Sequence, residues 1–228
     1  MDAHFCPQCT KILTLGRQGD YFAFVGVPRR LNLDLADLER RFRTLSRQFH
    51  PDYFYNASPA ERIASLERSS YLNDAYRTLK QPISRTAYLL ELEGVWTSAD
   101  KGEANASKQV PPALLEEVFA LNEELDEVRA LRESGAPADR WRSRLQGAAK
   151  PIEAKRAEHE QQLQSLAARW DALDGSGSPD DRKAVLNALR DRMLERNYIN
   201  NLLATIEREL SGSGLQASGS GHQPKPEV

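Results

Sequence analysis

Apolar residues recur every three or four positions along most of the chain, which is the spacing of amphipathic α-helices. One predicted helix begins after Asp34, a suitable N-cap, and ends at Phe49. The stripe expected to face the core consists of Leu35, Leu38, Phe42, Leu45 and Phe49. Nearly opposite that stripe lie three cations, Arg40, Arg43 and Arg47. The pattern predicts a helix with one buried face and one basic face.

A second long helix is marked by its start. The segment from Ser58 to Glu61 has the spacing of a capping box, with a proline at the first helical position. The helix is expected to reach Lys80, and the residues expected on its core side are Ile63, Leu66, Asn73, Tyr76 and Leu79. Pro82 then opens a shorter helix that Gly94 closes.

The rest of the pattern is also helical. Residues 21–25 are apolar enough for a strand, but no partner strand is evident, so a short helix is expected there. Three long amphipathic stretches follow near 112–133, 138–173 and 180–210, and Pro151 is expected to break the middle one into two helices. The predicted fold class is therefore all-α.

Composition shifts predict the domain boundaries. Residues 95–111 are polar and rich in helix breakers, which is typical of a linker, and the Gly- and Ser-rich tail at 211–228 is too poor in apolar residues to fold. The chain is expected to contain a Cys-bearing leader at 1–19, a compact helical domain at 20–94, and a helical bundle at 112–210.

The overall charge excludes some classes of function. Lys and Arg number 31 and Asp and Glu 33, so no basic excess drives nucleic-acid binding. No apolar run approaches the roughly 18 residues of a membrane span. Two cysteines cannot form a disulfide framework, and the first residues lack the pattern of a signal peptide. A cytoplasmic protein with neither nucleic acid nor membrane as partner is expected.

The connection between the two long helices carries His50, Pro51 and Asp52. Because Pro51 disfavours helical geometry at the preceding residue, the first helix should stop at His50 and present a rigid, exposed polar tripeptide. Three residues alone are a weak signal, and the tripeptide could be only a turn. An acid–base pair is not expected, because an exposed loop offers neither a pocket nor a third, orienting group.

In its context the tripeptide resembles that of the J-domain of DnaJ-type co-chaperones, over residues 20–94. The likeness lies in a basic helix, His-Pro-Asp at its end, a capped partner helix and a short closing helix. Members of that family stimulate ATP hydrolysis by an Hsp70 chaperone. By this resemblance the stimulating tripeptide is His50, Pro51 and Asp52, and the docking face is Arg40, Arg43 and Arg47.

Several further stretches are similar to the HscB family, the J-type co-chaperones of iron–sulfur cluster assembly. They are DYF at 20–22, NDAYRTL at 73–79, PISRTAYLL at 82–90 and LNEELD at 121–126. The chain has neither a Gly/Phe-rich segment nor CxxCxGxG repeats, so the general DnaJ layout does not match. The resemblance implies an L-shaped, two-domain adaptor with a C-terminal three-helix bundle. Such a protein binds the scaffold IscU and an HscA- or DnaK-like Hsp70, and it needs no cofactor and is not an enzyme.

Within residues 112–133 the pattern contains two apolar stripes. A bundle needs only one of them, consisting of Leu114, Val118, Leu121, Leu125 and Val128. Leu115, Phe119 and Glu123 form a second stripe, for which a partner protein is the usual explanation, although packing on the linker or the J-domain is the alternative. By the family resemblance Leu115, Phe119, Glu123 and Tyr198 sit at scaffold-binding positions. Tyr198 could equally be plain packing.

The two predicted binding regions differ in charge. Residues 29–50 carry six arginines against three acids, whereas residues 112–133 carry seven acids against two arginines. The two regions should therefore prefer different partners.

Cys6 and Cys9 have zinc-knuckle spacing, but a structural zinc site needs four ligands. His4 could supply a third, and some relatives carry a second CxxC pair that this chain lacks. The pair could be vestigial, share a zinc across a dimer, or be redox-active, and no bound metal is expected. His4 and His159 are expected on the surface.

Two other functions are compatible with the sequence. The chain could be a generic J-protein whose bundle binds unfolded clients or oligomerises. It could also be a zinc-dependent module built on Cys6 and Cys9.

Overall fold

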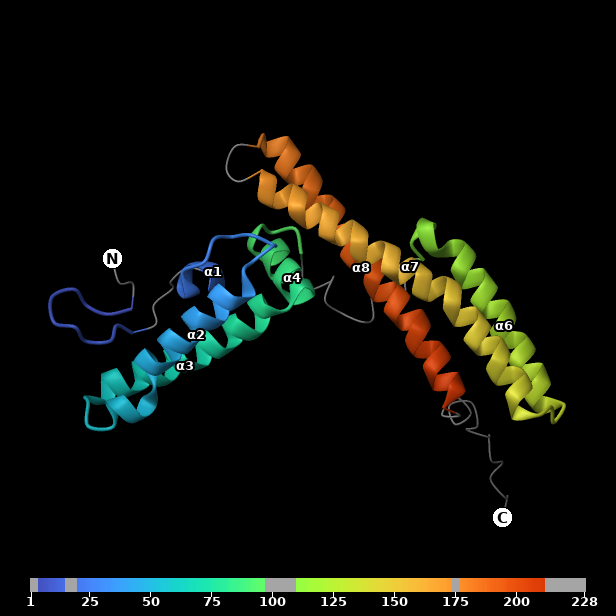
Figure 1. Cartoon of the computed structure of the whole chain (residues 1–228), viewed down its shortest axis with the longest axis horizontal. Coiled ribbons are helices and arrows are strands. Elements are labelled where there is room, and N and C mark those ends of the chain that lie inside the picture. The colour runs from blue at the N-terminus through green and yellow to red at the C-terminus, as the bar shows by residue number, and fades with distance from the viewer. Residues whose placement is uncertain (1–3, 15–19, 97–109, 174–176, 212–228) are drawn as a thin grey trace, which may run out of the picture. The chain divides into compact units, whose positions relative to one another are not determined.

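The computed structural model describes residues 4–14, 20–96, 110–173 and 177–211 (Figure 1). Within these ranges the regular structure is helical, and the β-pairing is one isolated bridge between Phe5 and Ile12. The predicted all-α class is therefore confirmed. The described residues form two compact units, and the ends of two long helices belong to the first unit. The predicted domain boundaries and the predicted L-shape stay predictions.

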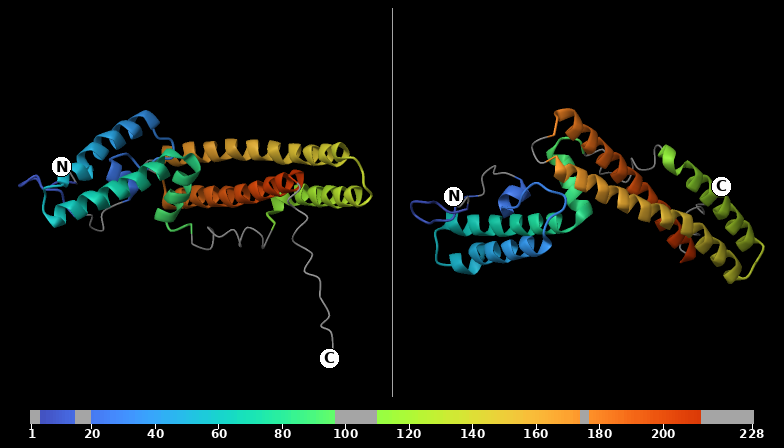
Figure 2. Two further views of the ribbon diagram at one scale, coloured as in Figure 1. Left: turned by 90° about the horizontal axis from the view of Figure 1, so that it is seen from below. Right: turned by 45° about the horizontal axis from the view of Figure 1, so that its top comes forward.

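The first unit comprises residues 4–14, 20–96, 163–173 and 177–190 of the described chain. Its elements are α1 (Tyr21–Val25), α2 (Leu35–Phe49), the short 3-10 helix η1 (Pro51–Phe54), α3 (Pro59–Lys80) and α4 (Pro82–Leu92). Helices α2 and α3 lie side by side along their length (Figure 2). The short helix at 21–25 is as predicted. Its N-cap is Asp20, whose side chain accepts a hydrogen bond from the Ala23 amide at 2.9 Å.

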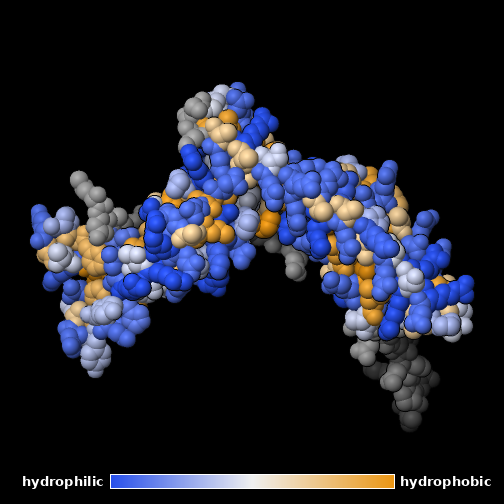
Figure 3. Space-filling view, in the orientation of Figure 1, coloured by the Kyte–Doolittle hydropathy of each residue, from blue (hydrophilic) through white to orange (hydrophobic). Residues whose placement is uncertain are grey.

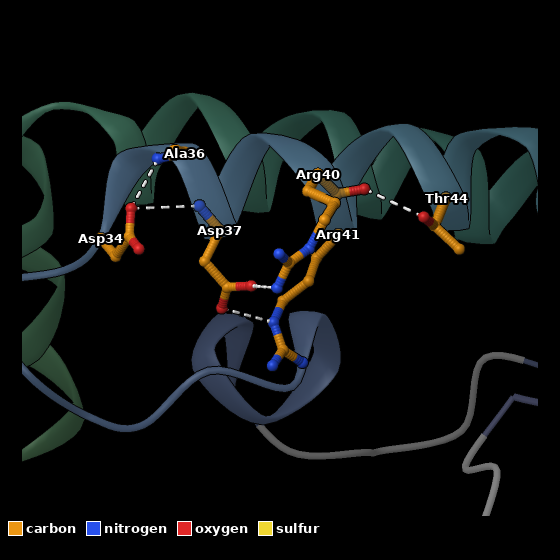
Figure 4. A network of polar contacts seen from close by, with 6 residues as sticks. All are labelled: Asp34, Ala36, Asp37, Arg40, Arg41 and Thr44. Carbon is orange, nitrogen blue, oxygen red and sulfur yellow. Dashed lines mark hydrogen bonds and ion pairs between the residues drawn. The ribbon is translucent and has the colours of Figure 1, made fainter.

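Helix α2 begins and ends where the sequence predicts. The Asp34 carboxylate accepts hydrogen bonds from the amides of Ala36 at 2.9 Å and Asp37 at 3.2 Å (Figure 4). At the other end the Phe49 carbonyl accepts from the hydroxyls of Ser65 at 2.6 Å and Ser69 at 2.9 Å, both on α3. Side chains of α3 thus bind a carbonyl at the end of α2 that has no partner within its own helix.

The core of the first unit includes five fully buried apolar side chains: Phe22, Leu38, Phe49, Leu72 and Leu79. Two expectations about its stripes are wrong. Leu35 is 48% exposed, so the buried stripe of α2 begins one turn later, at Leu38. On α3 the buried side consists of Ala64, Ser65, Arg68, Leu72, Ala75 and Leu79, while Ile63, Leu66 and Asn73 are exposed. The pattern misled because the buried start of α3 is made of small or polar residues, which allow close packing but carry little apolar signal.

Asp171, near the end of α7, contacts the connection between α1 and α2 within this first unit. Its carboxylate accepts hydrogen bonds from the amides of Leu31 at 2.7 Å and Asn32 at 2.8 Å, and from the Asn32 side chain at 2.8 Å. Arg85, which is buried beneath the unit's surface, has a pKa lowered by burial, and the Asp171 charge opposes that shift.

The second unit comprises residues 110–162 and 191–211. It contains the 3-10 turn η2 (Pro112–Leu114), α6 (Leu115–Glu133), and parts of α7 (Ala138–Ala172) and α8 (Pro179–Leu210). The core side chains come from all three helices and η2: Leu114, Leu121, Val128, Leu145, Ile152, Ile199, Leu203 and Ile206. His159 is also buried here, so the expectation of a surface position was wrong.

Helix α7 continues through Pro151, so the predicted break is wrong. A proline inside a helix costs about 3 kcal/mol, because it removes one amide donor and crowds the preceding turn. Leu145 and Ile152 flank it and are both buried in the core. Their burial contributes roughly 1.5–3 kcal/mol each, which is enough to offset that cost.

Residues 97–109 and 212–228 hold most of the predicted linker and tail, and they lie outside the described residues. The same is true of residues 1–3 and 15–19 of the predicted leader. Among the described helices, none combines the length and the apolar character that crossing a membrane requires. Hydrophilic residues cover most of the visible surface, and apolar residues show in scattered places (Figure 3).

Candidate functional sites

The tripeptide forms an exposed corner at the end of α2. His50 has extended backbone (φ −60°, ψ 126°), and Pro51 begins η1 immediately after it. The His50 Nδ1 accepts a hydrogen bond from the Asp52 amide at 3.3 Å and lies 3.5 Å from the Asp52 carboxylate. The side chains of His50 and Asp52 are 51% and 86% exposed. Local bonds therefore hold the tripeptide in one shape while both polar side chains stay open to a partner.

Acidic residues of α2 neutralise much of the predicted basic face. Arg40 and Arg41 both pair with Asp37 (Figure 4). Arg43 pairs with Glu39 at 2.5 Å. The hydrogen bond from Arg41 is the main reason that the pKa of the Asp37 carboxyl lies below its usual value. All three predicted docking residues are exposed.

Arg47 differs from the other two docking residues because it has no ion-pair partner among the residues that the structure describes. It lies one helical turn before His50. An arginine without an ion-pair partner therefore lies beside the tripeptide. The spacing in the sequence carries this signal, because Asp37 and Glu39 precede Arg40 and Arg43 by three or four residues, whereas Thr44 and Arg43 hold those positions before Arg47.

The second predicted stripe is exposed on α6. Leu115 is 41% exposed, Phe119 is 68% exposed, and Glu123 is also exposed. The neighbouring seam residues Leu114 and Leu121 are buried in the core. Because the core of the second unit is complete without Leu115 and Phe119, these side chains are available to a partner.

Tyr198 lies on a different helix, α8. Its side chain is half-buried and packs against the core of the second unit. The described contacts thus support a packing role for Tyr198, and its part in a binding surface stays a prediction.

An acidic groove next to the α6 stripe was not predicted. It has a volume of about 440 Å³ and is lined by residues of α6 and α7. Its lining includes apolar residues and four carboxylates: Glu116, Glu117, Glu123 and Glu124. Glu124 pairs with Arg144 at 2.8 Å, and Glu117 lies 3.7 Å from Lys155. The strong acidic excess of 112–133 was visible in the sequence, but the groove depends on residues of α7.

The cysteines lie in a tight hairpin that the Phe5–Ile12 bridge closes. The Cys6 amide donates to the Lys11 carbonyl at 2.9 Å, and the Cys6 carbonyl accepts from the Thr10 amide at 2.9 Å. Backbone amides of Gln8 and Cys9 donate to the Cys6 sulfur and lower its pKa. Both thiols are free, so this hairpin offers two of the four ligands of a structural zinc site.

His4 does not supply a third ligand, because both ring nitrogens are bound elsewhere. Its Nδ1 lies 2.7 Å from the Arg68 guanidinium and its Nε2 lies 3.1 Å from the Phe24 carbonyl. A guanidinium only donates, so Nδ1 accepts and Nε2–H donates to the carbonyl. His4 is buried, which corrects the expected surface position. No group of three potential metal-binding side chains occurs among the described residues.

Arg68 explains why the hairpin docks on the first unit. The side chain is fully buried, and its guanidinium donates to the Leu13 carbonyl at 2.8 Å. The guanidinium also lies over the rings of Phe24 and Phe49, at 5.9 and 5.8 Å from their centroids. One arginine in the core face of α3 thus connects the hairpin to the domain core. An arginine among the buried positions of a helix was the available signal, but its hydrogen-bond partners are more than 50 residues away.

No protein-family model matches the chain. Solved structures of two other proteins do match it. The human co-chaperone protein HscB is 25% identical, with a TM-score of 0.63, and the match covers 92% of this chain and 91% of that one. The chaperone HscB from Vibrio cholerae is 29% identical, with a TM-score of 0.59, and the match covers 85% of this chain and 99% of that one. The chain therefore has an HscB-like fold, and the resemblance seen in the sequence is confirmed.

Proposed function

We propose that this protein is a co-chaperone of iron–sulfur cluster assembly. It stimulates ATP hydrolysis by a specialised Hsp70 of the HscA or DnaK type and delivers the scaffold protein IscU to it. The main support is the HscB-like fold over most of the chain, within which His50-Pro51-Asp52 is exposed at the end of a basic helix. The chain performs no bond-breaking step of its own in this proposal.

On the Hsp70 side, α2 docks through its positive face and the tripeptide acts on the chaperone's conformation. Attraction between opposite charges steers docking and weakens as salt is added. Arg47 contributes most, because no acidic side chain of the described residues neutralises it. The tripeptide then favours the hydrolysing state of the Hsp70, which requires that it contact the two states of the chaperone differently.

On the scaffold side, Leu115 and Phe119 supply apolar contact area and Glu123 supplies charge. Exposed apolar side chains on one helical face are typical of a helix that binds a partner. Tyr198 borders the same surface in this proposal. Because one chain holds both partners, their effective concentration rises and modest individual affinities are enough.

The site of action is the cytoplasm, where thiols stay reduced. Both cysteines of the chain are free, which is compatible with a reducing compartment.

Single-turnover ATP hydrolysis by a cognate Hsp70 tests the proposal, with and without the scaffold. The expected result is stimulation by this protein and a further increase when IscU is added. Stimulation that does not change when IscU is added would support the Hsp70 part of the proposal. It would favour a generic J-protein that binds unfolded clients. A folded protein that gives no stimulation would contradict the proposal, and His50→Gln serves as the control that lacks the tripeptide's imidazole.

A further inference from the structure

The chain has two cysteines, and they meet within the turn of the N-terminal hairpin. The Cys6 carbonyl accepts a hydrogen bond from the Thr10 amide at 2.9 Å, and the Cys6 amide donates to the Lys11 carbonyl at 2.9 Å. Inside the turn that these bonds close, the Cys9 thiol hydrogen-bonds to the Cys6 sulfur. The two sulfur atoms are therefore in contact in the reduced protein, in which both thiols are free.

The backbone of the turn favours a negative charge on one of these sulfurs. The amides of Gln8 and Cys9 both donate to the Cys6 sulfur, and these hydrogen bonds lower the pKa of its thiol. The thiolate is the form of cysteine that attacks oxidants and disulfides. Cys9 is exposed and Cys6 is partly exposed, so a small oxidant can reach the pair from solvent.

Contacts on both sides of the turn hold the hairpin on the first unit. Before the turn, His4 is buried and binds the Arg68 guanidinium, and after it, Ile12 is buried in the core. The Leu13 carbonyl accepts from the same guanidinium at 2.8 Å. Residues 7–11 of the turn itself are exposed. A new bond between the two sulfurs would therefore change the turn and leave the core contacts of the hairpin in place.

A disulfide between Cys6 and Cys9 requires little movement of the chain. The bond from the Thr10 amide to the Cys6 carbonyl closes one helix-like turn, in which residues three positions apart face the same side. A structural zinc site needs four ligands, and no group of three potential metal-binding side chains occurs in the described part of the chain. The chemistry of a dithiol therefore accounts for this pair better than a metal site within one chain.

We propose that Cys6 and Cys9 form a reversible oxidation site, which a hydroperoxide converts into a disulfide within one chain. The Cys6 thiolate attacks one oxygen of the hydroperoxide and breaks the O–O bond. This step leaves a sulfenic acid on Cys6, and the released alkoxide takes up a proton to become an alcohol. The Cys9 thiol then attacks the Cys6 sulfur, the S–S bond forms, and hydroxide leaves with the Cys9 proton as water.

The overall reaction is balanced. Two thiols and one hydroperoxide give one disulfide, one alcohol and one water, so the pair loses two electrons to the peroxide. Reduced glutathione returns the pair to two thiols by thiol–disulfide exchange. The site does not depend on the proposed function, because it needs only the folded hairpin and the oxidant.

Hydrogen peroxide, added to the reduced full-length protein, tests the proposal. Both thiols should be lost together, and the mass of the intact monomer should fall by two hydrogen atoms. Reduced glutathione should restore both thiols. Circular dichroism and denaturant unfolding should show the same folded protein before and after oxidation, because the core contacts of the hairpin are kept.

Two matched variants separate the two steps. Cys9→Ser removes the second thiol, so the sulfenic acid on Cys6 should persist and react with dimedone. Cys6→Ser leaves a cysteine in the same turn, but the amides of Gln8 and Cys9 no longer face a sulfur. Dimedone labelling of Cys6→Ser should be roughly tenfold slower than that of Cys9→Ser.

Three results would overturn the proposal. The first is equal labelling of the two variants, which would show that the turn does not activate Cys6. The second is a disulfide that links two chains, or oxidation of the unaltered protein beyond the sulfenic acid. The third is zinc that stays bound in stoichiometric amount through dialysis and protects both thiols, which would assign the pair to a metal.

Discussion

The Nε2 atom of His159 on α7 lies 2.8 Å from Oε2 of Glu195 on α8, and the histidine side chain is only 1% exposed. Burial lowers the pKa of His159, and the charges of Arg192 and Lys155 lower it further. Burial raises the pKa of Glu195, although Arg192, which donates to its other oxygen at 2.7 Å, opposes the rise. Glu158 raises the pKa of His159 and so opposes the effect of burial, whereas Asp191 raises the pKa of Glu195 and adds to it. His159 is therefore neutral near pH 7 in the folded protein.

This pair predicts a pH dependence of stability. The unfolded chain binds a proton at His159 near the ordinary pKa of about 6.5, whereas the folded protein binds it only at lower pH. Between those two values the unfolded state holds more protons, so the free energy of unfolding falls as pH decreases. Glu195 works against this fall, because its raised pKa makes the folded state bind a proton more readily than the unfolded one.

Urea unfolding at pH 7.5 and pH 5.5 tests this prediction on His159→Gln and Glu195→Gln. His159→Gln should lose less stability on acidification than the unaltered protein, and Glu195→Gln should lose more. If all three proteins lose the same amount, the buried pair does not control the pH dependence.

Replacing Leu115 and Phe119 by alanine should weaken scaffold binding. If the two side chains are the anchors of the surface, the loss should be at least about 2 kcal/mol, or roughly 30-fold in Kd. Isothermal titration of IscU into each variant provides the measurement. Leu35→Ala is the matched control, because Leu35 has similar exposure and lies in the first unit. A loss below about 0.5 kcal/mol would mean that these side chains do not carry the binding.

Arg47→Ala should impair Hsp70 stimulation more than Arg40→Ala. Arg40 shares Asp37 with Arg41 and lies about 15 Å along the helix from His50, so removing it changes the field at the tripeptide less than removing Arg47 does. Arg47 has no such partner among the described residues. The half-maximal concentration should rise severalfold for Arg47→Ala at low salt, and the difference should shrink as salt is added. Equal effects of the two substitutions would contradict the larger contribution proposed for Arg47.

Cys6 should form a thiolate at lower pH than an ordinary cysteine. The amides of Gln8 and Cys9 stabilise the charged sulfur by hydrogen bonding, and the thiolate is the form that alkylating reagents attack. The rate of iodoacetamide labelling against pH, measured in Cys9→Ser, reports Cys6 alone. Adding Gln8→Pro removes the Gln8 amide as a donor, so the pH at which labelling reaches half of its maximal rate should rise. If the proline leaves that pH unchanged, the Gln8 amide does not stabilise the Cys6 thiolate.

Arg68→Leu should destabilise the first unit by about 2–4 kcal/mol, because it leaves the Leu13 carbonyl and the His4 ring without their donor in a buried site. Arg77→Leu is the matched control on the same helix, since the Arg77 side chain is 77% exposed. That control should change stability by less than about 1 kcal/mol. Denaturant unfolding of both variants measures the difference. Similar small losses in both would show that the buried guanidinium does not hold the hairpin to the core.

Local signals explain which predictions succeeded. The start of α2 depends on Asp34 and its end on Pro51, and the start of α3 depends on the capping box at Ser58. Each of these acts within four residues, so the sequence is sufficient to place them. The exposed tripeptide follows from the same local rules.

Predictions failed where burial depends on distant residues. Leu66 and Ile63 look like core residues by their character, yet the core of α3 forms over Ala64 and Ser65. Pro151 looks like a break, yet buried neighbours keep α7 continuous. His4 looks like a surface residue or a metal ligand, yet Arg68 and the Phe24 carbonyl occupy both of its nitrogens.

By itself the sequence determined the helices, their caps, the tripeptide at the end of α2 and the resemblance to HscB. Hydrogen bonds and backbone geometry within a few residues decide those features, so they can be read along the chain. Only the tertiary structure decided which face of each helix is buried, which distant groups the buried Arg68 binds, and where a groove forms beside α6. Those outcomes depend on packing and desolvation between segments that lie far apart in sequence, and the free energies involved belong to contacts that the linear pattern does not contain.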